Sequence, residues 1–411
     1  MDKKTIVVII VTALVLGLLI SSDVSAQKTL KIGVSCPLSG GGSAWGMEMK
    51  WSAEEVCKRI NKAGGVTIKG QTYMLEPVIY DNKYTSAEGS KVAQKLIYSD
   101  KVQVVIGAFG TPPIMALQNI TEKEKIVIFE TSWSKEANGI KVPYSFLQVD
   151  NPWNIFPVVI PRLKNKFPHI QKVAITGPND ESGWGTAEGA KEVYEKLGIK
   201  IVNLEYYDRT VTEMYPIVTK LLAQHPDIVD LGGSSPGEAA LILKVLWEMK
   251  YSGIKLWGPM PGWRMAVQAA GKEVVEGLYG GLAPDYKGVF STPLQRELAD
   301  KCERETGVAL SPLGICAWDA MMAVVEGWKQ SNSLDNTVLC DTLPKIIFES
   351  HFGPMAIGHT KLWGRPCQLL NPVCISQIKD GKLNETWRVI PDELKERLSA
   401  KGIDWTKYYP K

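Results

Sequence analysis

Short apolar runs alternate with amphipathic segments along most of this chain, and no other feature constrains its fold as strongly. In the first unit, an apolar run at residues 30–35 leads through small residues at 39–44 into a segment at 46–63. Apolar residues recur at helical spacing in that segment, which predicts a helix with one apolar face. Repeated units of this kind form mainly parallel sheets with helices on both faces.

The alternation predicts two α/β layers of similar size, separated by a polar, proline-containing break at residues 150–153. In the first layer we expect strands at 30–35, 74–80, 102–107 and 126–129 and helices at 46–63, 86–99 and 113–122. In the second we expect helices at 154–166, 186–197, 215–224 and 237–249 and strands at 172–176, 201–206, 228–231 and 255–257. After these the pattern predicts a strand at 278–282, helices at 292–306, 313–330 and 336–347, and a hairpin of 372–379 with 382–390 around Asp380-Gly381.

The first residues have the pattern of an export signal. Lys3 and Lys4 precede an apolar run at 6–20, and small residues follow up to Ala26. This predicts a signal peptide at residues 1–26, cleaved after Ala26, and a mature protein in the periplasm. The run is too short to cross a bilayer core of about 30 Å, because a helix rises only about 1.5 Å per residue.

Charge and metal-binding residue types narrow the range of partners. The net charge is only +3 and no basic cluster is interleaved with aromatic residues, so we expect no nucleic-acid partner. The seven cysteines have no zinc-ligand spacing and the four histidines are scattered, so we expect no metal and no cofactor. In an exported protein Cys367 and Cys374 are candidates for a disulfide with each other or with Cys340, and the odd count leaves a free thiol.

The glycine-rich loop at 39–44 has two interpretations. Free backbone N–H groups at a helix N-terminus can bind the polar end of a small ligand. The same glycines can equally form a flexible turn. A dinucleotide site is disfavoured, because Trp45 stands where the fingerprint requires a third small residue.

A hydrolase motif, G-x-S-x-G, occurs at residues 233–237 between an expected strand and an expected helix. In that motif the residue after the nucleophile donates its backbone N–H to the oxyanion. Here that residue is Pro236, which has no N–H, and the base would have to be His351 or His359, in a segment where the chain is expected to return between the two α/β layers. We therefore expect a protein that is not an enzyme.

A set of ordered segments carries a family resemblance: KIGVSCPLSGGGSAWG, RINKAGGV, VVIGAFGTP, FETSWS, NDESGWGTAEGAKE, DIVDLGGSSPGEAALILK, LWGP and the hairpin around KDGK. Together they resemble the type I periplasmic solute-binding proteins, and most closely the leucine/isoleucine/valine-binding group that serves ABC importers. The resemblance implies an α/β fold of two lobes joined by three crossings, near 149–151, 277–282 and 351–354, with a ligand between the lobes. Lobe 1 would then comprise 27–149 plus 279–352, and lobe 2 would comprise 150–278 plus 353–411.

The resemblance also implies positions for the ligand-binding residues. In lobe 1 it places Thr111 as a hydroxyl donor and the segment Thr131-Ser132-Trp133-Ser134 as the grip on a ligand carboxylate. Trp45 and Trp184 stand in place of tyrosines that flank the ligand, whereas Trp247, Trp318 and Trp328 are interpreted as core residues on helices. In lobe 2 the family's tyrosine and acid, which hold the α-ammonium group, match Ser234 and Met260.

Met260 sets the expected ligand class. A buried ammonium group without an anionic partner costs several kcal/mol, and Met260 supplies no charge. Either another acid such as Glu130 or Asp285 has taken that role, or the ligand is not a free α-amino acid. The tryptophans, with Trp263, suggest an apolar or aromatic carboxylate with Arg264 as its partner, although indole faces can also bind a quaternary ammonium.

These observations predict an exported, monomeric binding protein that delivers a small ligand to a membrane ABC permease. The alternatives are a branched-chain or other amino-acid binding protein, and a ligand-sensing periplasmic protein of the same fold, because function depends on the site and its partners.

Overall fold

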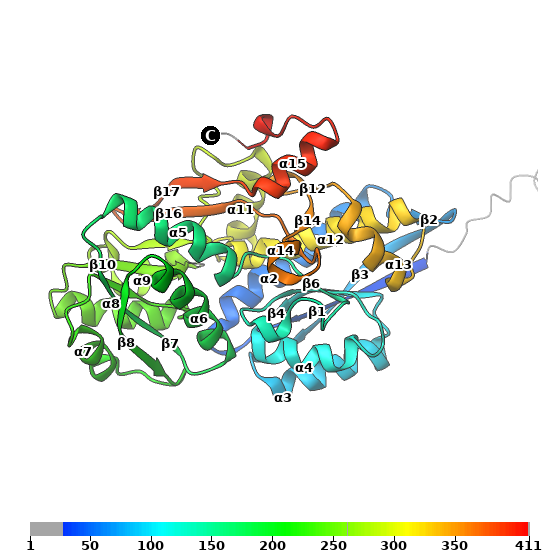
Figure 1. Cartoon of the computed structure of the whole chain (residues 1–411). Helices are drawn as coiled ribbons and strands as arrows, with labels where there is room; N and C mark the ends of the chain where they lie inside the picture. The colour runs from blue at the N-terminus through cyan, green and yellow to red at the C-terminus, as the bar shows by residue number, and fades with distance from the viewer. Residues whose placement is uncertain (1–27, 261, 410–411) are drawn as a thin grey trace, which may run out of the picture.

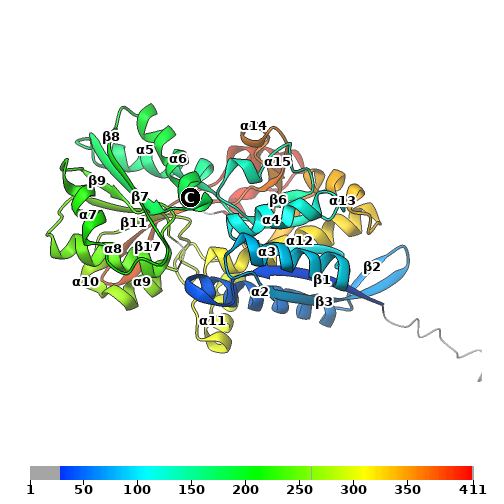
Figure 2. The same ribbon diagram turned by 90° about the horizontal axis from the view of Figure 1, so that it is seen from below.

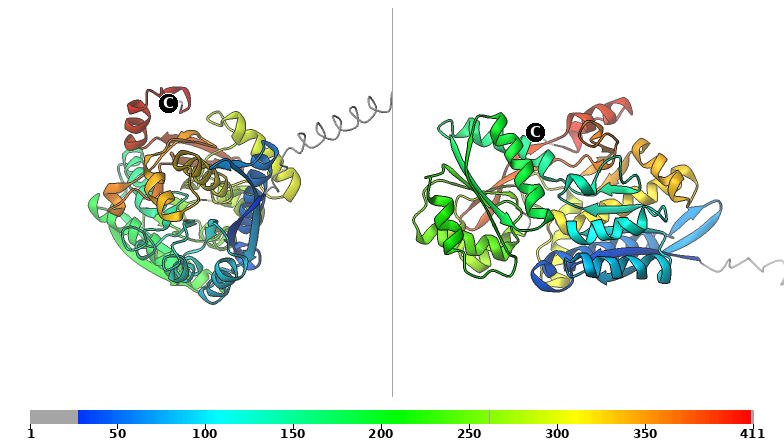
Figure 3. Two further views of the ribbon diagram at one scale, coloured as in Figure 1. Left: turned by 90° about the vertical axis from the view of Figure 1, so that its right-hand side faces the viewer. Right: turned by 60° about the horizontal axis from the view of Figure 1, so that its bottom comes forward.

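Two mainly parallel sheets organise the computed structural model, which describes residues 28–260 and 262–409 (Figure 1). The predicted signal peptide at 1–26 lies outside the described residues. The described helices include none that is both long and apolar enough to span a membrane. Each sheet forms one lobe with its helices, and Figure 2 and the right-hand view of Figure 3 show the lobes side by side from further directions.

The first sheet has the order β14-β15-β6-β5-β4-β1-β3-β2. Its strands are β1 (Lys28–Cys36), β2 (Val66–Ile68), β3 (Gln71–Asp81), β4 (Val104–Phe109), β5 (Ile128–Thr131), β6 (Ser145–Leu147), β14 (Ile357–Gly358) and β15 (Gln368–Leu369). The helices of this lobe are α2 (Ser43–Lys62), α3 (Ser86–Gln94), α4 (Thr111–Thr121), α11 (Pro293–Thr306), α12 (Pro312–Ser331) and α13 (Asn336–Thr342).

Adjacent residues of β4 show how this sheet is covered. Ile106 packs in the core cluster of α2 and α12, whereas Val105 packs in the cluster of α3 and α4. Successive side chains of a strand point to opposite faces, so these helix pairs cover opposite faces of the sheet. Both faces are buried, which explains why the strand reads as a continuous apolar run.

The second sheet has the order β17-β16-β11-β10-β9-β7-β8. Its strands are β7 (Lys172–Pro178), β8 (Lys200–Tyr207), β9 (Ile228–Asp230), β10 (Ile254–Pro259), β11 (Tyr279–Gly281), β16 (Val373–Lys379) and β17 (Lys382–Val389). The helices are α5 (Pro152–Lys166), α6 (Glu181–Lys196), α7 (Tyr215–Leu222), α8 (Pro236–Glu248), α9 (Trp263–Ala270) and α10 (Lys272–Val275). Strands β16 and β17 form the predicted hairpin, and Asp380 and Gly381 both have the positive φ of its tight turn.

The chain passes between the sheets three times, after β6, after β11 and between β15 and β16. The first passage agrees with the expected crossing at 149–151. The third does not lie at 351–354, because β15 pairs with β6 of the first sheet and only β16 joins the second. Sheet membership thus differs from the expected lobe ranges: β11 belongs to the second sheet, and β14 and β15 belong to the first.

The C-terminal segment also packs on the first lobe, as Figure 1 shows for α15 (Asp392–Ala400), beside β14 and the two-stranded sheet of β12 (Phe348–Ser350) and β13 (Gly353–Met355). The Glu393 carboxylate accepts a hydrogen bond from the His359 N–H at 2.8 Å, and the Tyr409 hydroxyl donates to the Pro354 carbonyl at 2.6 Å.

The cysteines differ from the disulfide expectation, because all seven are free thiols. Cys367 directly precedes β15 in the first lobe, whereas Cys374 lies on β16 in the second sheet. Cys340 lies on α13 and points its thiol toward the Pro143 carbonyl. The expected partners therefore belong to different parts of the fold, although two of them are close in sequence.

Candidate functional site

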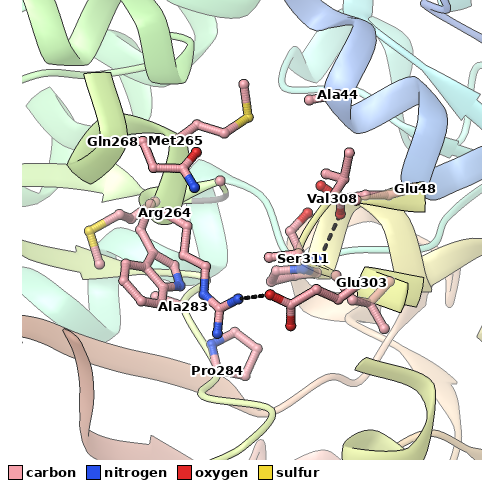
Figure 4. Close-up of a pocket in the computed structure, with 17 residues that line it drawn as sticks. Ala44, Glu48, Arg264, Met265, Gln268, Ala283, Pro284, Glu303, Val308 and Ser311 are labelled. Atoms are coloured by element: carbon pink, nitrogen blue, oxygen red, sulfur yellow. Dashed lines mark hydrogen bonds and ion pairs between the residues drawn. The ribbon is translucent and has the colours of Figure 1, made fainter. Parts of the chain in front are cut away.

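A pocket of about 270 Å³ lies between the two lobes. Figure 4 shows α9 of the second lobe on one side and α2 with the segment before α12 on the other. The residues that line it are Ala44, Glu48, Met260, Gly262, Trp263, Arg264, Met265, Gln268, Ala283, Pro284, Glu303, Gly307, Val308, Ala309, Leu310, Ser311 and Pro312. An engineered apolar cavity of about 150 Å³ is known to hold benzene, so this pocket has room for one substituted ring.

Arg264 is the cation among the described lining residues. Its Nη1 lies 2.8 Å from Glu303 Oε1 on α11, so the ion pair joins the two lobes across the pocket (Figure 4). The guanidinium also lies 5.6 Å from the Trp263 ring centroid. A hydrogen bond from Lys287 holds the pKa of Glu303 below its usual range, with Arg264 adding to the effect. The pocket therefore presents a bidentate donor that is already paired.

Glu48 is one of several pocket residues that the sequence analysis missed, and it is the buried acid among them. Its side chain is buried, and its Oε2 accepts a hydrogen bond from the Ser311 N–H at 2.6 Å. Burial raises the pKa of Glu48 to about 8, against the opposing effect of the Ser311 groups. Gly314 on α12 makes room for it, because a β-carbon at position 314 would lie 2.3 Å from the Glu48 β-carbon.

A sequence signal for Glu48 does exist. Trp45, Glu48, Ser52 and Glu55 are all buried, and they follow one another at spacings of three or four along α2. They form a polar edge beside the apolar stripe that the periodicity identified. This spacing places Glu48 on the buried side of α2, which the apolar stripe alone did not indicate.

The first-lobe hydroxyls are brought close to the lobe interface. Thr111 Oγ1 accepts hydrogen bonds from the Trp133 N–H at 3.0 Å and from Ser182 Oγ of the second lobe at 3.1 Å. The Tyr84 hydroxyl lies 2.9 Å from the same Ser182 hydroxyl. Contacts of this kind hold the lobes together, and these hydroxyls do not line the pocket.

The other expected carboxylate-gripping residues have partners within the first lobe. Thr131 Oγ1 accepts a hydrogen bond from the Gln148 side chain at 3.0 Å, and Ser132 Oγ accepts one from Asn138 at 2.8 Å. Ser134 Oγ accepts from the Glu136 N–H at the start of a short helical turn. Their hydroxyls stabilise the loop after β5.

Trp45 and Trp133 lie at the junction of the lobes. Both indoles are buried, and neither Nε1 has a hydrogen-bond partner among the described residues. The second lobe approaches each of them through a glycine. A β-carbon at Gly262 would lie 3.3 Å from Trp45 Nε1, and one at Gly185 would lie 1.8 Å from the Trp133 carbonyl oxygen.

Two expected site residues lie elsewhere. Trp184 is 47% exposed and donates its indole N–H to the Asn179 side chain at 3.0 Å. Ser234 is buried, donates to the Leu231 carbonyl and accepts from the Tyr207 hydroxyl at 2.7 Å. Neither residue lines the pocket, whereas Met260, Trp263 and Arg264 do.

The two glycine motifs have structural roles. Residues 39–41 are exposed, and from the 39–44 loop only Ala44 reaches the pocket. Ser235 of the G-x-S-x-G motif is the N-cap of α8: its side chain accepts from the Glu238 N–H, and the Glu238 carboxylate accepts from the Ser235 N–H. A capping box of this kind stabilises the start of a helix.

The described residues contain no group of three or more potential metal ligands.

The buried acid named as an alternative partner for an ammonium group, Glu130, lies outside the pocket. Its pKa is raised to about 8 by burial, and neither carboxyl oxygen has a hydrogen-bond partner of acceptable geometry among the described residues. Asp285 likewise does not line this pocket.

The comparison with protein families decides the identity of the fold. A model of the periplasmic binding protein family matches residues 29–382. The chain belongs to that family. The resemblance found in the sequence and the two-lobed α/β fold are both confirmed.

This periplasmic binding protein is similar in sequence to amino-acid binding proteins and similar in structure to several solved solute-binding proteins. It is 24% identical over 341 residues to the leucine-, isoleucine-, valine-, threonine- and alanine-binding protein of Pseudomonas aeruginosa, covering 80% of this chain and 85% of the relative. A leucine-binding protein of Thermotoga maritima has a TM-score of 0.76 at 18% identity, over 89% of this chain and all of that one. A solute-binding protein of an R. palustris ABC transporter, solved with benzoate, has a TM-score of 0.74 at 17% identity, over 88% and 97%. At these identities the structures establish the shared fold alone.

Proposed function

We propose that this periplasmic binding protein is exported with cleavage after Ala26, captures a small apolar or aromatic carboxylate between its lobes and delivers it to an ABC importer. Met260 carries the proposal. Its side chain is fully buried and lines the pocket at the position where the resemblance places the acid for an α-ammonium group. A methionine there favours an apolar ligand surface.

Arg264 favours a carboxylate as the polar end of the ligand. It lines the same pocket from the same lobe, and a guanidinium binds carboxylate in a bidentate manner. Trp263 and Met265 give the pocket apolar surface for a ring. The structural relative that was solved with benzoate indicates that this fold accommodates such a ligand.

An amino acid is the second candidate, because Glu48 and Glu303 place two carboxyl groups in the pocket. Glu303 is already paired with Arg264 and Lys287, and burial keeps the Glu48 carboxyl protonated at neutral pH. Both circumstances weaken their attraction for an ammonium group. The curated relatives bind amino acids, so the test has to include them.

The experiment is isothermal titration of residues 27–411 with benzoate, leucine and choline, preceded by thermal shift with the same compounds. A ligand that binds the folded state at one hundred times its Kd stabilises it by about 2.7 kcal/mol. Binding of benzoate without binding of leucine is the expected result. Binding of leucine alone contradicts the proposed ligand class, and Edman sequencing of the exported protein tests the cleavage after Ala26.

A further inference from the structure

The wall of the pocket opposite Arg264 holds a pair of incompletely bonded polar groups. Glu48 uses Oε2 to accept the Ser311 N–H, and no hydrogen bond forms to its Oε1 among the described residues. The Ser311 hydroxyl lies close enough to the Glu48 carboxyl to lower its pKa, but the two do not meet hydrogen-bond geometry and the buried hydroxyl oxygen has no other partner among the described residues. Both residues line the pocket, and Figure 4 shows them across from Arg264 and Gln268.

The buried Ser311 hydroxyl is costly unless something completes its hydrogen bonds. A buried polar atom without a partner costs about 1–3 kcal/mol relative to a paired one, so buried polar groups almost always have partners. Ser311 is the N-cap of α12, yet its side chain makes no capping hydrogen bond. Gly314 provides space for the Glu48 side chain in this position against α12.

We infer that Glu48 and Ser311 form a second polar subsite, which recognises a hydroxyl group on the ring of the bound carboxylate, away from the end held by Arg264. This inference rests on the proposed function, because it assigns a ligand group to the opposite wall of the same pocket. The ligand class becomes a hydroxy-substituted aromatic carboxylate.

An uncharged ligand group fits this wall better than a cation. No cation of the protein forms an ion pair with Glu48 among the described residues, and burial favours its neutral form. A carboxylic acid and a serine hydroxyl each donate and accept, and so does a ring hydroxyl. An ammonium group would require Glu48 to ionise in a buried site, which is unfavourable.

The test is isothermal titration at pH 7 with benzoate, 3-hydroxybenzoate, 4-hydroxybenzoate and 4-(aminomethyl)benzoate. The wild type is expected to bind one hydroxybenzoate about tenfold more tightly than benzoate, the usual size of one added buried hydrogen bond. Glu48→Met should weaken the binding of that hydroxybenzoate more than the binding of benzoate, so that the preference is lost. Glu48→Gln, which keeps a donor and an acceptor, should retain most of it.

Glu54→Met is the matched control, because Glu54 lies on the same helix with its side chain 49% exposed. Its binding profile should match the wild type. If circular dichroism shows that Glu48→Met does not fold, Ser311→Ala replaces it as the test. The subsite predicts that Ser311→Ala reduces the preference for the hydroxybenzoate over benzoate.

Equal binding of benzoate and the hydroxybenzoates by the wild type, or a preference that survives Glu48→Met or Ser311→Ala, overturns the subsite and leaves the proposed function standing. Tighter binding of 4-(aminomethyl)benzoate than of either hydroxybenzoate also overturns it, in favour of a cation site. Absence of binding to every aromatic carboxylate overturns the subsite and the proposed function together.

Discussion

Gly185 on α6 of the second lobe faces the backbone carbonyl of Trp133 in the first lobe so closely that a β-carbon at Gly185 would lie 1.8 Å from that oxygen. A side chain at position 185 therefore does not fit the arrangement of the lobes in this structure unless the backbone shifts. Gly185→Val should hold the lobes apart and reduce ligand affinity at least about tenfold, because ligand binding then has to overcome the clash. Isothermal titration and the radius of gyration from small-angle scattering measure both effects.

The control for this variant is Gly237→Ala. Gly237 also lies on a second-lobe helix, α8, but a β-carbon there would have no atom within 4 Å. We expect wild-type affinity and wild-type dimensions for it. An unchanged radius of gyration and unchanged affinity in Gly185→Val would show that the two lobes do not close along this surface.

Arg264 should contribute far more to ligand binding than to stability. A hydrogen bond to a charged group contributes about 1.5–3 kcal/mol, so Arg264→Gln should weaken the binding of an aromatic carboxylate by about 10- to 100-fold. In its ion pair with Glu303, the Arg264 side chain is 35% exposed and the Glu303 side chain is 41% exposed. Ion pairs with this exposure contribute about 0–1 kcal/mol to the free energy of folding. Urea unfolding should therefore change little. Arg304→Gln, an exposed change on α11, is the control and should bind normally.

Glu130 should make the wild type less stable in alkaline solution. Burial raises its folded-state pKa to about 8 from an ordinary value of 4.5, so the folded state binds the proton more tightly than the unfolded state. The resulting stabilisation is complete below about pH 4.5 and is lost as the pH rises through 8. Relative to Glu130→Gln, the wild type should lose free energy of unfolding between pH 5 and pH 9, measured by urea titration.

Glu48 and Asp150 are also buried with raised pKa values, about 8 and about 7, but they are present in both proteins and cancel in that comparison. Glu396→Gln changes an exposed glutamate on α15 and should run parallel to the wild type at every pH. Parallel curves for Glu130→Gln and the wild type would show that Glu130 does not retain its proton in the folded state.

The seven cysteines should all be titratable as thiols once the protein is unfolded. Alkylation of residues 27–411 in denaturant without reductant, followed by intact mass spectrometry, should add seven labels. In the native protein six thiols are buried, and Cys340 is only partly accessible. Burial also raises the pKa of Cys57 and Cys340 to about 12, so native labelling should be slow at all positions. Fewer than seven labels after unfolding would reveal a disulfide.

Periodicity was sufficient to predict most of the sheet and helix order. The predicted segments at 46–63, 292–306 and 313–330 correspond to α2, α11 and α12 within a few residues. The third crossing, which the resemblance implied near 351–354, lies later in the chain, and periodicity could not correct it because the two-residue strands β14 and β15 are too short to produce an alternation. Their assignment depends on a single parallel contact with β6, which local sequence does not encode.

The site was harder to predict, because exposure depends on neighbours from distant segments. Met260, Trp263 and Arg264, which the resemblance and their side-chain chemistry made ligand-binding candidates, line the pocket after β10 of the second sheet, and their role in binding stays a prediction. Trp184 was interpreted as a cleft residue and Trp247 as a core residue, yet they are 47% and 54% exposed. Glu48 was overlooked because an acid on a helix is usually solvent-facing, and the space for its burial comes from Gly314, which is distant in sequence.

The three passages between the sheets constrain the order in which this protein can acquire its structure. The strands β14 to β17, which complete one edge of each sheet, all come from residues 357–389. As the chain emerges from the ribosome or a translocation channel, neither lobe can finish folding until about nine-tenths of the sequence has appeared. Until then the strands formed from earlier segments have an unpaired edge in each sheet. A chaperone that shields such edges would act on both lobes at once.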